Sequence, residues 1–344
     1  MVRPRAVKVL YAVLLTALLV ASVPAVIAVA EGFRNPTATG VPAAAPPSAT
    51  PSPPPSPTAL PAPAAPPTVT PTPRPPGVRG LEIGVPAYVW ADAPMLTDVT
   101  ATGPAASLVV LNPGNGDAPF DAAWRARADA LRAGTTATGE RTKVLGYVHT
   151  DHGKRDPEAV KASVDNYLKP LGKDRRLHVD GIFFDVVSRD CGPDNATRDH
   201  YAALRRHVQD AMRAVDPTAT DLVVNNPGTA IADCYLEPGH RTADIFVTYE
   251  DTYAAYTSDG WRGGNVFDAE SGYRPGTELD PTGTAFWHLV HEVPDDPAMR
   301  ATLRTAFDRG AGYAYATDTV MPNPWNAAPT WKFGAQTGYA STLG

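Results

Sequence analysis

Two acidic residues in this sequence each end an apolar run of strand length. Asp185 closes the run Val179–Asp185, and Glu250 closes the run Asp244–Glu250. Two carboxyl groups brought together suit the hydrolysis of an acetal, because one can protonate the leaving oxygen while the other attacks or activates water. Each acid taken alone could instead cap a turn or pair with an arginine.

Both runs are apolar on both alternating faces, which is typical of parallel strands buried on both sides. Strand alternation puts Phe183 on the same face as Asp185, and it puts Phe246 and Thr248 on the same face as Glu250. Each acid then lies at the C-terminal tip of its strand, where α/β barrels and open α/β sheets carry their chemistry.

Alternating strand and helix patterns fill the chain from residue 80 onward. The expected strands are Ile83–Trp90, Ser107–Asn112, Lys143–Val148, Asp180–Asp185, Asp221–Asn226, Asp244–Glu250, Thr284–Val290 and Gly312–Thr317. The expected helices are Ala122–Ala133, Pro157–Leu168, Thr197–Val215 and Pro297–Arg309. This rhythm predicts an α/β fold, a single-domain (β/α)8 or TIM barrel over residues 79–344. An open doubly wound sheet is the alternative, but no glycine-rich nucleotide motif follows any strand.

Polar and aromatic side chains gather at the expected strand ends, which a barrel brings to one face. Besides the catalytic candidates Asp185 and Glu250, we expect the following to bind substrate: Tyr88, Trp90, Asn112, Tyr147, His149, Asn226, Trp287, His288, Asp318 and Trp325. The aromatic members could stack on sugar rings, although each could equally belong to the core. The polar members would position the sugar.

A zinc-dependent hydrolase, such as a barrel deacetylase, is a competing hypothesis. His149, Asp151 and His152 are close in sequence, and His288 and His291 are three residues apart, yet neither group has the His-Glu-x-x-His spacing. We expect His291 to be exposed, and we predict neither a metal nor a cofactor.

The first 78 residues differ in composition from the rest. Residues 1–34 combine a basic start with an uncharged apolar stretch, and they predict a cleaved signal peptide or an uncleaved membrane anchor. Residues 35–78 contain 17 of the 37 prolines and predict a disordered, extended linker. The chain is therefore expected to be exported, as a secreted or membrane-anchored extracellular protein that touches a membrane only through this first segment.

Charge and cysteine content add two expectations. Residues 80–344 carry 24 Lys and Arg against 35 Asp and Glu, a net charge of −11, which argues against nucleic acid as a partner and is compatible with a neutral or cationic ligand. The two cysteines, Cys191 and Cys234, are expected to form a disulfide in an exported protein. We expect a monomer.

Several short motifs resemble the spherulation-specific family four of secreted barrel glycoside hydrolases. They are Val85-Pro86-Ala87-Tyr88, Leu111-Asn112-Pro113-Gly114, Gly146-Tyr147-Val148-His149-Thr150, Val179 to Asp185, Asn226-Pro227-Gly228-Thr229, Thr248-Tyr249-Glu250, and Thr317-Asp318 followed by Asn323-Pro324-Trp325. The resemblance implies an endo-acting hydrolase of polysaccharides that contain galactosamine or N-acetylgalactosamine, with Asp185 and Glu250 as its catalytic carboxylates.

One position departs from that resemblance. The family usually has Asp-Glu where this chain has Asp185-Val186. Alternation would turn residue 186 away from the barrel axis, so the missing Glu need not remove a catalytic group. If that Glu does act as acid or base, this chain differs in mechanism or is a non-catalytic, glycan-binding or wall-associated module.

Overall fold

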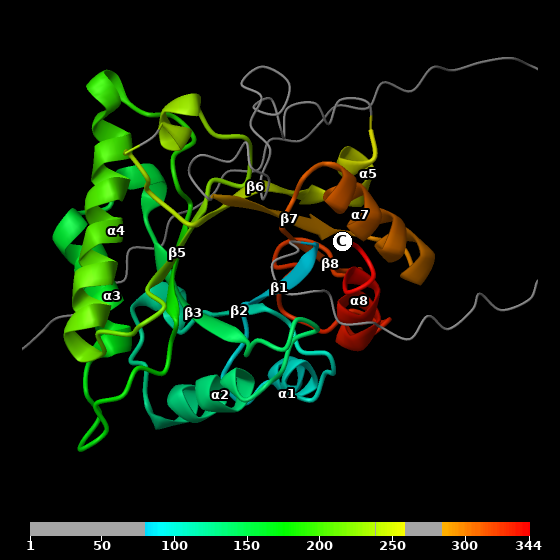
Figure 1. Cartoon of the computed structure of the whole chain (residues 1–344), viewed down its shortest axis with the longest axis horizontal. Coiled ribbons are helices and arrows are strands. Elements are labelled where there is room, and N and C mark those ends of the chain that lie inside the picture. Colours follow the sequence, from blue (N-terminus) through cyan, green and yellow to red (C-terminus); the bar gives the residue numbers. More distant parts are fainter. Residues whose placement is uncertain (1–79, 238, 259–283) are drawn as a thin grey trace, which may run out of the picture. The chain divides into compact units, whose positions relative to one another are not determined.

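The computed structural model describes residues 80–237, 239–258 and 284–344, so the expected leader and linker lie outside the described residues. Eight parallel strands close into one barrel in sequence order, as Figure 1 shows. They are β1 (Glu82–Ala87), β2 (Leu108–Leu111), β3 (Lys143–His149), β4 (Gly181–Asp185), β5 (Leu222–Asn226), β6 (Ile245–Thr252), β7 (Ala285–His291) and β8 (Tyr313–Ala316). The predicted (β/α)8 barrel is confirmed, and each predicted strand overlaps an observed one.

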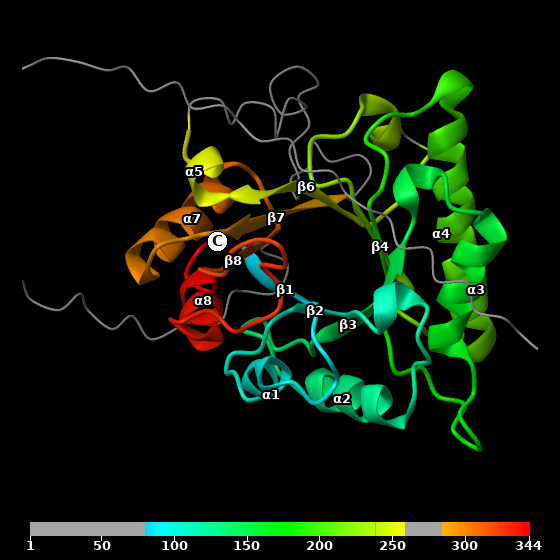
Figure 2. The same cartoon turned by 180° about the vertical axis from the view of Figure 1, so that it is seen from behind.

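Helices surround the ring of strands in both views (Figures 1 and 2). They are α1 (Pro94–Thr100), α2 (Ala122–Arg132), α3 (Pro157–Leu168), α4 (Ala196–Val215), α5 (Tyr253–Tyr256), α7 (Asp296–Asp308) and α8 (Phe333–Ala340). Four short 3₁₀ turns accompany them: η1 (Gly114–Gly116), η2 (Asp151–Gly153), η3 (Pro193–Asn195) and η4 (Asp233–Leu236). No described helix has both the length and the apolar character that a bilayer span requires.

The predicted helices begin where their sequences supply a cap. Asp121 accepts hydrogen bonds from the first backbone N–H groups of α2, and Asp156 does the same for α3, which has proline at its first position. Asp295 caps α7 in the same way. These carboxylates satisfy N–H groups that have no partner inside the helix, so the local sequence sets each start.

Large side chains fill the barrel interior below the strand tips. Phe183 and Trp287 meet edge to face with ring centroids 5.8 Å apart, and both are fully buried. The indole of Trp287 requires glycine on β1, because a Cβ at Gly84 would lie 2.6 Å from its ring. The barrel is therefore a packed core and not a pore, and this fold carries its active sites above that core, at the C-terminal ends of the strands.

An irregularity in β6 changes which way Glu250 faces. The register with β7 shifts between Val247 and Tyr249, which leaves Thr248 as an extra residue in the strand. Phe246 packs outside the barrel against Tyr235 of η4, with ring centroids 5.8 Å apart. The predicted common face for Phe246, Thr248 and Glu250 is therefore wrong, because a bulge reverses the alternation and turns Glu250 toward the barrel mouth.

Candidate active site

The two acids meet through a single amide. Asn226, the last residue of β5, donates from Nδ2 to Asp185 Oδ1 and to Glu250 Oε2, each over 2.7 Å. The two oxygens are therefore separated by at most twice that distance. The amide is held in this orientation because its Oδ1 accepts a 2.8 Å hydrogen bond from the Gly228 N–H.

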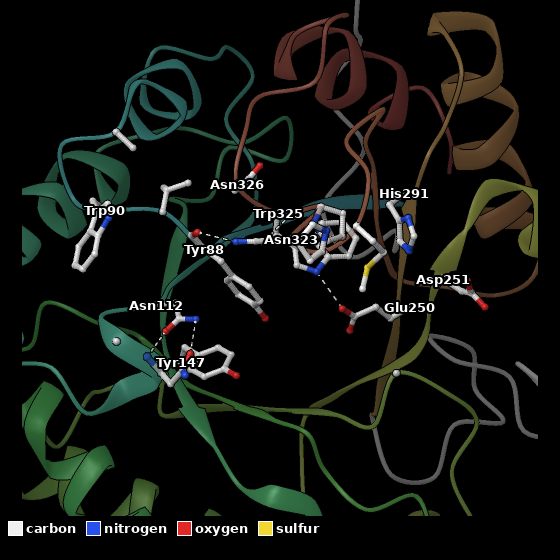
Figure 3. Close-up of a pocket in the computed structure, with 18 of the residues that line it drawn as sticks. Tyr88, Trp90, Asn112, Tyr147, Glu250, Asp251, His291, Asn323, Trp325 and Asn326 are labelled. Carbon is white, nitrogen blue, oxygen red and sulfur yellow. Dashed lines mark hydrogen bonds between the residues drawn. The ribbon is translucent and has the colours of Figure 1, made fainter. Parts of the chain in front are cut away.

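Two further donors complete the contacts of the carboxylates. The Tyr147 hydroxyl donates to Asp185 Oδ2 over 2.6 Å. The Trp325 indole N–H donates to Glu250 Oε1 over 3.0 Å, a bond that Figure 3 marks. Every carboxylate oxygen of the pair thus accepts a hydrogen bond from the protein. Such a network fixes both acids before any ligand binds.

The loop between β8 and α8 places the Trp325 indole. The Trp325 N–H donates to Asn323 Oδ1 over 3.1 Å, and the Trp325 carbonyl accepts from the Tyr88 N–H over 3.0 Å. The first and last strands of the barrel therefore cooperate to hold one donor against Glu250. The contact between Tyr88 and Trp325 is not visible in local sequence spacing, because the two residues lie at opposite ends of the domain.

Burial raises the pKa of both carboxyl groups. The pKa of Glu250 rises to about 7, first because of burial and second because of the negative charge of Asp185, while the Asn226 and Trp325 donors oppose the rise. The pKa of Asp185 is also raised by burial, but hydrogen bonds from Tyr147, the Val186 backbone and Asn226 stabilise its charged form. The pair titrates as a coupled unit.

A cavity of about 1220 Å³ opens beside Glu250 at the C-terminal end of the barrel (Figure 3). Tyr88 and Tyr147 form one wall, with ring centroids 5.2 Å apart, and the ring of Tyr88 points toward Glu250 (Figure 3). Within the described ranges, the buried Tyr88 hydroxyl has no hydrogen-bond partner. Its pKa is raised well above the usual value by burial and by the nearby acids, so the hydroxyl keeps its proton.

Six predicted site residues line this cavity: Tyr88, Trp90, Asn112, Tyr147, Glu250 and Trp325. Asp185 and Asn226 do not line the cavity, but each is hydrogen-bonded to a residue that does: Asp185 to Tyr147, and Asn226 to Glu250. The loops after β2 and β8 add residues that sequence reasoning missed, namely Asn115, Met321, Asn323 and Asn326. The Asn-Pro pairs in those two loops were the available signal.

Two predicted sugar contacts lie in the core instead. Trp287 and His288 are both 0% exposed and do not line the cavity. His288 Nδ1 forms a 2.8 Å hydrogen bond with the Tyr256 hydroxyl, and burial lowers its pKa to about 3, so the ring is neutral. These expectations are wrong because Trp287 packs in the barrel interior against Phe183, below the strand tips, and His288 faces Tyr256 of α5.

His291, and not Trp287 or His288, is the β7 residue that lies at the mouth of the barrel. It lines the cavity and packs edge to face on Trp325, with ring centroids 6.1 Å apart. The expectation that His291 is exposed is therefore wrong, since only 5% of the residue is accessible.

His149 and Asp318 lie near the strand tips without lining the cavity. The His149 carbonyl accepts a 3.0 Å hydrogen bond from Arg155. The Asp318 carboxylate binds the hydroxyl of Thr330 over 2.5 Å and its N–H over 3.3 Å, which ties down the loop after β8. Both residues support the mouth, and neither is placed to touch a ligand in the cavity.

The histidines and acids do not assemble into a metal centre in the described part of the chain, where no group of three or more His, Cys, Asp or Glu side chains could hold an ion. The contacts of the site are hydrogen bonds among two acids, an amide, a phenol and an indole. Such a site is equipped for proton transfer and for nucleophilic attack by a carboxylate.

A family model described as spherulation-specific family 4 matches residues 82–335, which is the whole barrel. The chain belongs to this family. The crystal structure of Aspergillus clavatus Sph3 in complex with GalNAc has the same fold, with a TM-score of 0.59 at 23% identity over 77% of this chain and 99% of that one. The PgaB (BpsB) glycoside hydrolase domain from Bordetella bronchiseptica is more distant, with a TM-score of 0.42 at 12% identity over 69% of this chain and 94% of that one. A comparison with curated proteins found no match.

Val186 replaces the glutamate expected at this position in the spherulation-specific family. It directly follows β4 and has a φ of 52°, a left-handed conformation that is costly for a β-branched residue. Its carbonyl accepts hydrogen bonds from the His152 N–H and the Thr150 hydroxyl, which hold this turn in place. Because the strand has already ended, the alternation rule cannot give the direction of residue 186.

The predicted disulfide is present between Cys191 and Cys234. It joins the loop after β4 to η4, which follows β5. The Tyr235 hydroxyl reinforces the same link by donating to the carbonyls of Ser188 and Asp190, over 3.0 and 3.1 Å. The loops that follow Asp185 and Asn226 are thus fastened to each other beside the site.

Proposed function

We propose that this chain is an exported glycoside hydrolase that cleaves polysaccharides containing galactosamine or N-acetylgalactosamine. The observation that carries the proposal is the Asn226 amide, which holds Asp185 and Glu250 together at the barrel mouth. Membership of the spherulation-specific family and the fold shared with Sph3, whose structure contains GalNAc, support it.

The different environments of the two acids support a different role for each. Glu250 has a pKa near 7 because it is buried beside a negative charge, so it keeps a proton at neutral and mildly acidic pH and can act as the general acid. Asp185 accepts hydrogen bonds from Tyr147, the Val186 backbone and Asn226, which favour its ionised form. A pair of carboxyls driven to different protonation states is the usual arrangement of acid and nucleophile.

The separation of the acids favours retention of configuration. Retaining glycosidases have carboxyl groups about 5–5.5 Å apart, whereas inverting ones need about 6.5–9.5 Å to admit a water. The shared Asn226 nitrogen keeps Asp185 Oδ1 and Glu250 Oε2 at most twice 2.7 Å apart, which is below the inverting range. Glu250 would protonate the glycosidic oxygen, and Asp185 would attack the anomeric carbon once the sugar reaches it past the Tyr147 side chain, which separates Asp185 from the cavity. Glu250 would then deprotonate the water that releases the sugar.

The cavity favours a neutral or cationic sugar polymer. No lysine or arginine is found among its described lining residues, which include the acids Glu250 and Asp251. A protonated galactosamine would be attracted to these acids, and an anionic sugar would be repelled. The cavity volume of about 1220 Å³ exceeds the roughly 300–1,000 Å³ of ordinary ligand pockets. Trp90, which is 73% exposed, lies at the side of the cavity away from Glu250, where its ring can stack on a distal sugar (Figure 3). These features support endo action.

The test is hydrolysis of a galactosamine-containing galactan polymer by the purified chain, measured as release of reducing ends. We expect Asp185→Asn and Glu250→Gln each to lower turnover by about 10²–10⁴-fold. The matched control is Asp151→Asn, an exposed strand-end acid outside the cavity, which should keep wild-type turnover. Wild-type turnover in both site variants would refute the catalytic assignment.

Two other results would point to the rival functions. Binding of the polymer without release of reducing ends would indicate a glycan-binding module. Loss of activity on treatment with a chelator, restored by zinc, would indicate a zinc hydrolase. We also propose that the chain is exported and acts as a monomer, which N-terminal sequencing of the protein from the medium or membrane fraction and its mass in solution would test.

A further inference from the structure

A second cavity, of about 840 Å³, lies at the opposite end of the barrel from the candidate active site. Its walls come from the loops that lead into β3, β4 and β5, and these loops meet at the N-terminal ends of the strands. Chemistry in this fold takes place at the other end, so catalysis does not account for a hollow here.

The charge of this cavity is opposite to that of the candidate active site. Its lining contains three carboxylates, from Asp174, Asp180 and Asp216. It also contains five cationic side chains, from Arg132, Arg141, Lys173, Arg175 and Arg176. The lining is therefore net positive in a domain whose residues 80–344 carry a net charge of −11. Cations concentrated in a hollow produce a local field that attracts anions even when the whole domain is acidic.

Only part of this positive charge is neutralised within the protein. Asp180 is buried and accepts from Arg141 over 2.6 Å and from Arg132 over 3.2 Å, so one carboxylate serves two guanidinium groups. It also accepts from the Val144 N–H over 2.9 Å, which anchors it to β3. Arg132 also lies 4.0 Å from the Asp129 carboxylate, which is 3.5 Å from Arg176 as well. These ion pairs hold the arginines in place, and the positive charge that no carboxylate offsets comes from Lys173 and Arg175.

Lys173 and Arg175 have no structural task in the described part of the chain. Both side chains are exposed at the cavity, and neither forms a hydrogen bond or an ion pair there. Their neighbour Arg176 differs, because it pairs with Asp174 over 3.0 Å. Two free cations beside two fixed guanidinium groups form a site in which anionic groups would find both a long-range attraction and rigid hydrogen-bond donors.

We propose that this basic cavity binds the phosphate or carboxylate groups of an anionic polymer. The Arg132 and Arg141 side chains are 24% and 46% exposed, so the anionic groups of a polymer strand can reach both of them. The candidate active site, at the opposite end of the barrel, would face away from the bound polymer.

The experiment measures binding of the full chain to polyphosphate, to polygalacturonate and to neutral dextran at low and high salt. We expect binding to one or both polyanions, weakened by salt, and no binding to dextran. The variant Lys173→Glu/Arg175→Glu should weaken polyanion binding at least about tenfold, because it reverses two unpaired charges at the site. Comparison of the two polyanions shows whether phosphate or carboxylate is preferred.

The control is Lys154→Glu/Arg206→Glu, which changes the net charge equally at two exposed cations outside the cavity, and it should bind within about twofold of wild type. Equal losses in both variants would overturn the proposal, as would the absence of polyanion binding by the wild type. Binding only to vesicles that contain phosphatidylglycerol would also overturn it in favour of a membrane. If the reversed variant fails to fold, Lys173→Gln/Arg175→Gln should still weaken binding about threefold relative to the control.

Discussion

Replacing Asp185 by Asn should lower the pKa of Glu250. The negative charge of Asp185 is the second largest cause of the raised Glu250 pKa, after burial, and the substitution removes this charge while it keeps the size of the side chain. At a separation of about 5 Å and an effective dielectric constant of about 20, two unit charges interact by about 3 kcal/mol. That energy corresponds to roughly two pKa units.

Burial remains in the variant, so the pKa of Glu250 should fall from about 7 by one to two units without returning to the value of a free glutamate. The measurement is ¹³C NMR of the glutamate side-chain carboxyls across a pH titration, with Glu250→Gln used to assign the signal. This readout does not depend on catalysis, which the same substitution is expected to abolish. A Glu250 pKa that stays near 7 in the Asp185→Asn protein would refute the coupling on which the acid and nucleophile roles rest.

Three further predictions concern the support of the site. Replacing Asn226 by Ala removes a donor from each carboxylate, so the pKa values of Asp185 and Glu250 should both rise. The kcat should fall about 10- to 100-fold, and the pH profile of kcat/KM should move to higher pH. A pH profile that does not move would contradict the bridging role of Asn226. Replacing Cys191 and Cys234 together by Ser opens a link across 43 residues and should lower the free energy of unfolding by about 4 kcal/mol, measured by urea denaturation. An unchanged urea midpoint would show that other contacts hold the linked loops. Replacing Val186 by Gly removes the strain of a β-branched residue in a left-handed conformation, so the free energy of unfolding should rise by about 1 kcal/mol in the same assay. A loss of stability would mean that the packing of the Val186 side chain outweighs this strain.

The described strands show how far local pattern carries. Apolar runs bounded by turn residues predicted β4 and β5 to within one residue. The helical spacing of α3, with proline at its first position, predicted the bounds Pro157–Leu168. These features are decided by residues that are close in sequence, through alternation, periodicity and capping. The family motifs are likewise local, and they were sufficient to indicate the barrel and its two acids.

The same rules failed where distant residues decide the geometry. Alternation could not show the shift in β6, because an extra residue in a strand is defined only by pairing with β7. Alternation puts His288 and His291, three residues apart, on opposite faces of β7, but it could not show which face lies toward the cavity and which toward α5.

The sequence alone determined the order of strands and helices, the acids at two strand ends and the pair of cysteines, because each depends on neighbouring residues. Tertiary structure decided that Asn226 bridges Asp185 and Glu250, that Trp325 reaches Glu250 from the last loop, and that five cations gather at the other end of the barrel. The physical reason is that hydrogen bonds and pKa shifts depend on distances of a few ångströms between side chains. Asp185, Asn226 and Glu250 meet because β4, β5 and β6 lie side by side, and Trp325 reaches Glu250 because β8 closes the ring with β7 and β1.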